Sequence, residues 1–159
     1  KGVRLKDMPA EWFAVPTDEA MKNSMVATRC VFTCNRLMDE EKFEEADAHM
    51  AHLLEIESGI VGLHHDLLMC DRIYVELIGQ NRTEVIASMM TKEQKKFMKA
   101  MKRFPSVLRT QYALAVLEEK NVSKAETIKG DFDKAAKSYP YPHEIESERE
   151  LMRIVDQKC

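Results

Sequence analysis

No run of alternating Val, Ile and Thr residues occurs anywhere in the 159-residue chain. Such runs are the signal of half-buried β-strands, so their absence excludes sheet-based enzyme scaffolds, including the Rossmann and P-loop folds. Only five Gly and five Pro residues interrupt the sequence, whereas good helix formers such as Met, Ala, Leu, Glu and Lys are abundant. The sequence therefore predicts an all-α fold.

Two prolines divide the chain into a short arm and one helical domain. Pro9 and Pro16 leave no room for a regular element, so we expect residues 1–16 to form an irregular arm. Residues 17–159 have the size of a single domain with a full hydrophobic core.

Start and stop signals predict about eight helices joined by short turns. Thr91-x-x-Gln94 and Ser123-x-x-Glu126 are capping boxes, and Asn81 is expected to cap the helix that precedes them. The expected helices cover about residues 18–38, 40–57, 60–78, 82–90 and 92–103, then one from 105, one capped by Ser123 and ending near 139, and one over 142–157.

Charge and cysteine content indicate a soluble chain in a reducing compartment. The 24 Lys and Arg residues nearly balance 27 Asp and Glu residues, which disfavours a general nucleic-acid or membrane binder. The longest apolar stretch, residues 113–117, is too short to span a bilayer, and no secretion signal is present. Cys30 and Cys34 lie one helical turn apart, beyond disulfide distance, so we expect four free thiols and a cytoplasmic location.

An internal repeat relates two segments near the ends of predicted helices. Residues 97–105 (FMKAMKRFP) recur 35 residues later as residues 132–140 (FDKAAKSYP), with Phe, Lys, Ala, Lys and Pro identical. The apolar residues of each copy share one face of a helix. The repeat therefore predicts equivalent buried positions in two stacked hairpins for Phe97, Ala100, Phe132 and Ala135.

This spacing of Phe, Ala and Pro resembles the close of a tetratricopeptide (TPR) repeat, whose period is about 34 residues. The resemblance implies a TPR-like superhelix of stacked antiparallel hairpins, which binds proteins or peptides on the concave surface formed by the first helix of each hairpin. Related repeats that grip a C-terminal carboxylate have Asn and a basic residue at the positions of Asn35 and Arg109. The resemblance thus implies a ligand surface formed by Asn35, Arg109 and Tyr112. Arg109 would be exposed on this surface, so the substitution Arg109→Glu would leave the fold intact.

The opening segment, residues 2–13, is similar to the junction in Gram-positive bacterial membrane proteins that carry a soluble helical tail. Some of those proteins are related to site-2-type metalloproteases, but this chain contains no His-Glu-x-x-His motif, so no peptidase activity is implied. The similarity implies a bacterial protein in the cytoplasm or on the cytosolic face of a membrane. Its tether would be a region that precedes Lys1.

Residues 92–109 form the one strongly basic stretch, with seven Lys and Arg residues against one Glu. Residues 1–60 have the opposite balance, with seven cationic and twelve acidic residues. Six cations of the basic stretch fall on one side of a helix, where they would face solvent or contact an acidic partner or anionic lipid head groups. These six residues are Lys92, Lys95, Lys96, Lys99, Lys102 and Arg103.

Three His and Cys groups are the only candidates for metal chemistry: His49-x2-His52, His64-His65-Asp66 and Cys30-x3-Cys34. The cysteines share the core face of their helix, and no Glu-x-x-His pair or activated nucleophile is present. We therefore expect no catalytic residue, metal or cofactor, and favour a non-catalytic module that binds a protein or peptide. The alternatives are a metal-dependent enzyme or regulator and a purely structural tail of a membrane-embedded partner.

Overall fold

The computed structural model describes residues 24–55 and 62–159, with side chains from residue 32 in the first range and from residue 65 in the second. These residues form eight α-helices and no strand, which confirms the all-α class for this part of the chain. The predicted arm, residues 1–16, lies outside the described residues. The helices are α1 (Ser24–Asp39), α2 (Phe43–Glu55), α3 (Gly62–Ile78), α4 (Thr83–Met89), α5 (Lys92–Ala100), α6 (Pro105–Ala113), α7 (Val122–Ser138) and α8 (Pro142–Gln157), and a π-helical turn (Leu114–Glu118) continues α6.

Strong local signals predicted several helix ends correctly. Helix α3 ends directly before Gly79, and α8 begins at Pro142 as expected. Thr91 caps α5, because its hydroxyl accepts a hydrogen bond from the Gln94 backbone N–H at 3.1 Å.

The predicted caps of α7 and α4 are wrong. The Asn121 side chain caps α7 by accepting a hydrogen bond from the Lys124 N–H at 3.0 Å, so Ser123 lies inside the helix. Asn81 does not cap α4; it adopts a left-handed conformation, with φ at 51°, and Arg82 precedes the helix. Asn is favoured both at caps and in left-handed turns, so its presence alone does not decide between them.

Helix α5 ends at Ala100, one turn before the predicted end at Arg103. Phe104 stands directly before Pro105, and a residue in that position avoids the helical region because it would clash with the proline ring. Phe104 accordingly has φ −94° and ψ 117°, in the extended region. The chain therefore leaves α5 early and turns before α6 begins.

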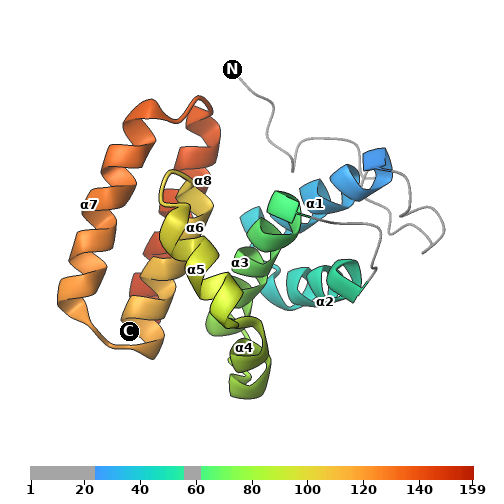
Figure 1. Cartoon of the computed structure of the whole chain (residues 1–159), viewed down its shortest axis with the longest axis horizontal. Helices are drawn as coiled ribbons and strands as arrows, with labels where there is room; N and C mark the ends of the chain where they lie inside the picture. The colour runs from blue at the N-terminus through green and yellow to red at the C-terminus, as the bar shows by residue number, and fades with distance from the viewer. Residues whose placement is uncertain (1–23, 56–61) are drawn as a thin grey trace.

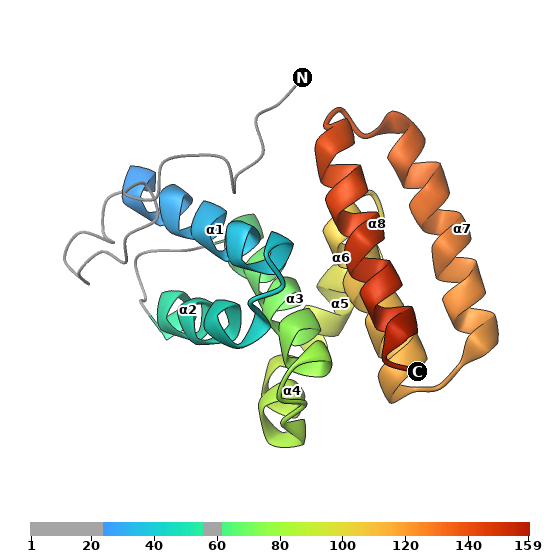
Figure 2. The same cartoon turned by 180° about the vertical axis from the view of Figure 1, so that it is seen from behind.

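Helix α3 lies at the centre of the molecule (Figures 1 and 2). It packs against both α2 and α6, and α1 packs against α2. Helix α6 also packs against α7 and α8, while the short helices α4 and α5 connect α3 to α6. The contact between α3 and α6 therefore joins the N-terminal helices to the C-terminal ones.

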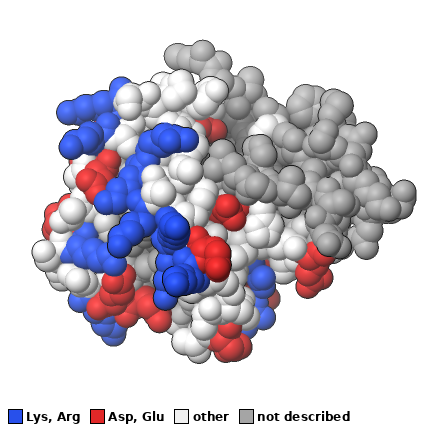
Figure 3. Space-filling model, viewed as in Figure 1, with Lys and Arg blue, Asp and Glu red and all other residues white. Residues whose placement is uncertain are grey.

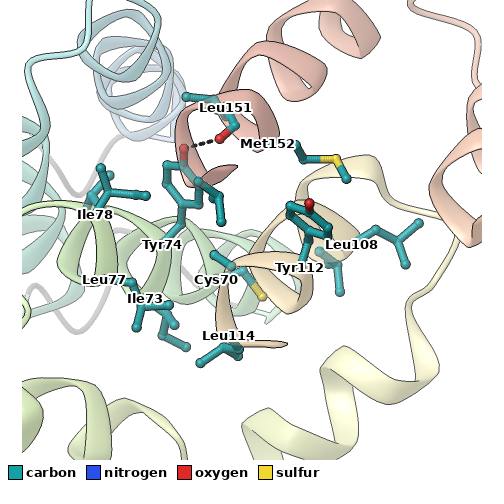
Figure 4. Close-up of a cluster of buried hydrophobic side chains, with 14 of the residues drawn as sticks. Cys70, Ile73, Tyr74, Leu77, Ile78, Leu108, Tyr112, Leu114, Leu151 and Met152 are labelled. Carbon is teal, nitrogen blue, oxygen red and sulfur yellow. Dashed lines mark hydrogen bonds between the residues drawn. The ribbon is translucent and has the colours of Figure 1, made fainter. Parts of the chain in front are cut away.

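The core is built around this contact. Cys70, Ile73 and Tyr74 of α3 and Leu108 of α6 are each 0% exposed and lie in one cluster (Figure 4). The Tyr74 hydroxyl donates a hydrogen bond to the backbone oxygen of Leu151 in α8 at 2.5 Å. Tyr74 thus ties the α3–α6 core to α8.

The two copies of the internal repeat are not buried alike. Phe132 is buried, as expected, but Ala135 and Phe97 are only half-buried and Ala100 is exposed. The prediction that Ala100 is buried is therefore wrong, because α5 ends at this residue. Helix α5 has 9 residues and ends at Ala100, whereas α7 has 17 and continues to Ser138, so only Phe132 and Ala135 lie within a long helix.

Candidate functional site

The structure contradicts the expected ligand surface formed by Asn35, Arg109 and Tyr112. Arg109 and Tyr112 lie on α6 with exposed fractions of 1% and 3%, and Asn35 is half-buried on α1. Helix α6 is covered by α3, α7 and α8, so its side chains face neighbouring helices instead of an open concave surface. The expectation that Arg109 is an accessible ligand contact is therefore wrong.

Arg109 instead holds a buried ionic cluster that links α3, α6 and α8. Its Nη2 lies 2.5 Å from Asp71 Oδ1, and its Nε lies 2.7 Å from Glu148 Oε2. The guanidinium carbon lies 4.7 Å from the centre of the Tyr74 ring. Burial raises the pKa of both carboxyl groups, and the Arg109 charge opposes that rise. The cluster is thus a structural element of the core.

A second cluster of charges joins α2, α3 and α4. Glu76, which is 0% exposed, accepts hydrogen bonds from the backbone N–H of Arg82 at 2.7 Å and from its Nε at 3.0 Å. Asp47 accepts hydrogen bonds from Arg72 at 3.2 Å and from Arg82 at 2.8 Å. Burial alone would raise the pKa of Glu76, but the Arg82 hydrogen bonds outweigh it and hold that pKa below its usual range. Like the Arg109 cluster, this second cluster is a structural element that stabilises the packing of helices.

The six cations of the basic stretch are all exposed, and we call them the basic surface. Among the described residues, none of the six has a carboxylate within ion-pair distance, and Arg103 lies over the Phe104 ring at 5.0 Å. Figure 3 shows Lys and Arg side chains gathered over the part of the molecule where Figure 1 draws α5. The basic surface consists of Lys92, Lys95, Lys96 and Lys99 on α5 and of Lys102 and Arg103 in the turn after it, so the expectation that all six lie on one helix is wrong for the last two.

Buried side chains on the inner face of α5 fix the orientation of the basic surface. Gln94 and Met98 are each 3% exposed. Gln94 Nε2 donates hydrogen bonds to the Asp66 backbone oxygen at 3.1 Å and to Cys70 Sγ at 3.3 Å, both in α3. The Met98 backbone oxygen accepts a hydrogen bond from Gln111 Nε2 of α6 at 3.1 Å. Sequence reasoning missed this anchor, although Gln94 was recognised as part of a capping box.

A shallow hollow between α7 and α8 is a second candidate, lined by Phe132, Met152 and charged side chains. Its two carboxylates already have partners: Asp133 lies 2.8 Å from Arg149 Nη1, and Asp156 accepts a 2.5 Å hydrogen bond from the Tyr112 hydroxyl. The charges in the hollow are thus largely matched within the chain. The basic surface has more unmatched charge and is the stronger candidate.

The His and Cys groups considered for metal binding are not assembled in the described part of the chain. There, no group of three or more His, Cys, Asp or Glu residues is placed to hold a metal ion. His49 is half-buried, and burial lowers its pKa, whereas burial raises the pKa of the Cys70 thiol to about 12. The side chains of Cys30 and His64 lie outside the described ones.

No protein-family model matches the chain, and comparisons with curated proteins and with solved structures found no match either. Within the described residues, none of the helices has both the length and the apolar character needed to cross a bilayer. Evidence on function therefore comes from the surface of the molecule itself.

Proposed function

We propose that this chain is a non-catalytic binding module that attaches to an acidic segment of a partner protein through the basic surface. The observation that carries the proposal is the set of six exposed cations without carboxylate partners among the described residues. Ordinary surface helices mix both signs of charge, whereas α5 has only Glu93 to offset its lysines. A ligand rich in Asp and Glu would supply the missing charge.

The spacing of the lysines gives such a ligand an energetic advantage. Lys92 and Lys96, and likewise Lys95 and Lys99, stand four residues apart on α5, so their charges repel along one face. Each like-charged pair at this spacing costs about 0.2–0.5 kcal/mol. An acidic ligand relieves this repulsion when it binds, in addition to forming its own contacts.

Lysine side chains also indicate the kind of recognition. An ammonium group on a flexible stem acts as a point charge, whereas bidentate recognition of a fixed carboxylate or phosphate geometry favours Arg. Five of the six cations are Lys. The surface therefore suits a ligand that presents several Asp and Glu carboxylates without a fixed geometry, associates quickly and dissociates as salt is added.

The double substitution Lys95→Glu and Lys99→Glu tests this proposal. We expect the affinity for a fluorescein-labelled poly-glutamate peptide, measured by anisotropy at low salt, to fall at least about tenfold, or about 1.4 kcal/mol. The matched control is Lys134→Glu with Lys137→Glu on α7, which changes the net charge equally at two exposed lysines. Equal losses of affinity in both variants would show a nonspecific charge effect and contradict the proposal. If the protein binds anionic lipid vesicles and not the peptide, the ligand of the basic surface is a membrane and not a protein.

We further propose that the protein is bacterial and works in the cytoplasm or on the cytosolic face of a membrane. Cys70, which is buried, and Cys159, which is exposed, are free thiols, as expected in a reducing compartment. We also propose that the helices are arranged as a TPR-like stack of hairpins. Its support is the packing of α6 against α7 and of α1 against α2, each pair being consecutive in the chain.

Thiol titration checks the proposed compartment. We expect the unfolded protein, prepared without reductant, to react with four equivalents of Ellman's reagent, because Cys30 and Cys34 are one helical turn apart and cannot bridge without distortion. A count of two would contradict both the absence of a disulfide and the cytoplasmic location.

A further inference from the structure

A small acidic area on the same chain has the negative charge that would complement the basic surface. Glu41, in the turn after α1, and Glu44 and Glu45, in the first turn of α2, are all exposed. None of the three has a cationic partner among the described residues, because the nearby Lys42 and Arg36 both pair with Glu40. We call Glu41, Glu44 and Glu45 the acidic surface.

Local helix chemistry explains only part of this surface. Carboxylates in a first turn interact favourably with the helix dipole, which accounts for Glu44 and Glu45. Glu41 lies outside the helix and has a left-handed φ of 59°, so the dipole argument does not apply to it. Phe43, between them, packs edge-to-face on Tyr74 with ring centres 6.1 Å apart and fixes this end of α2 to the core.

The two charged surfaces lie on opposite sides of α3. Helices α2 and α5 both pack against α3, and Figures 1 and 2 show α5 on the near side in one view and the start of α2 on the near side in the other. The acidic surface therefore does not neutralise the basic surface of its own molecule. Two copies can bring the surfaces together.

We propose that the occupant of the unpartnered face of α5 is a second copy of this chain, which presents its acidic surface to the basic surface. This inference rests on the proposed function and identifies its partner. Because the two surfaces differ and face opposite ways, the contact is head-to-tail, and each added copy leaves one surface of each kind open. The small formal charge of −3 allows copies to approach, and the contact is electrostatic.

Sedimentation of the wild-type protein gives the first test. At about 0.01 M salt, where charges act over about 30 Å, we expect the weight-average mass to rise above 18.4 kDa as protein concentration increases. At about 1 M salt, where that length falls to about 3 Å, the mass should return to the value of one chain. A single-chain mass at every concentration in low salt would overturn the inference.

A charge-swap experiment identifies the surfaces. Glu44→Lys with Glu45→Lys, and separately Lys95→Glu with Lys99→Glu, should each give a protein that stays a single chain at low salt. An equimolar mixture of the two variants should associate again, because the unaltered basic surface of the first variant then meets the unaltered acidic surface of the second. The matched control, Glu126→Lys with Glu146→Lys at exposed positions of α7 and α8, should associate like the wild type.

The outcomes separate this inference from the proposed function. If the wild type binds the poly-glutamate peptide but stays a single chain, the acidic-partner function stands and self-association is wrong. Association that survives both double substitutions, or variants that fail to associate when mixed, would also overturn the pairing of these surfaces. Circular dichroism of every variant checks that the helical fold is kept. The salt dependence of the wild-type mass tests self-association without any substitution.

Discussion

Replacement of Arg109 by Met is expected to lower the free energy of unfolding by about 3–5 kcal/mol, because it leaves the buried carboxyl group of Asp71 and the half-buried one of Glu148 without their cation. Arg109 is 1% exposed and bridges Asp71 on α3 and Glu148 on α8. Urea unfolding followed by circular dichroism measures the loss. Charge reversal at Arg109 should be worse still, in contrast to what an exposed position would show.

The loss should also depend on pH in a defined direction. Burial already raises the pKa of Asp71 and of Glu148, and removal of Arg109 takes away the charge that opposes the rise. A carboxyl group whose pKa is higher in the folded than in the unfolded state reduces stability as pH increases through the folded pKa. The variant should therefore approach wild-type stability as the pH falls toward the ordinary carboxyl pKa of about 4, and fall furthest below it at neutral pH.

A triple variant separates lost charge balance from lost packing. Asp71→Asn, Arg109→Met and Glu148→Gln together remove every charge of the cluster, and replacement of a complete buried ionic group is often neutral or stabilising. We expect the triple variant to be more stable than Arg109→Met alone. If both are equally unstable, the role of Arg109 is packing on Tyr74, whose ring lies 4.7 Å from the guanidinium carbon.

The position of Arg109 shows why its role was not predicted from the sequence. Its partners lie 38 and 39 residues away, so no local pattern connects them. One signal was available: α6 leads directly into the longest apolar stretch, residues 113–117, and a helix that is apolar on most sides lies inside a protein. A lone Arg on such a helix is expected to be paired.

Features that depend on neighbours in the sequence were more predictable. The Thr91 cap and the Pro142 start of α8 depend on backbone groups within one turn, and both were predicted correctly. The spacing of the lysines on α5 likewise predicted correctly which face of this helix is exposed to solvent. For the acidic surface, the sequence indicated only an excess of acidic residues over residues 1–60. The turn between α1 and α2 decides which of these carboxylates stay unpaired, and that pairing could not be predicted from the sequence.

Replacement of Phe132 by Ala is the second large effect that we expect, at about 3–5 kcal/mol. Phe132 is 1% exposed, and the guanidinium carbon of Arg149 lies 5.1 Å from the centre of its ring. The substitution leaves a cavity that α7 and α8 cannot fill without moving. Urea unfolding should show a lower midpoint with an unchanged denaturant slope.

The same measurement on Phe97→Ala decides whether the internal repeat has a structural meaning. Phe97 is half-buried on the shorter helix α5, so its replacement should cost less than that of Phe132, and Ala100→Glu should cost about 0.5 kcal/mol or less because Ala100 is exposed. Equal losses for the two phenylalanines would instead support equivalent positions in stacked hairpins. A smaller loss at Phe97 would indicate that the sequence repeat persists while the packing of its first copy has diverged, leaving α5 free to present its lysines to a partner.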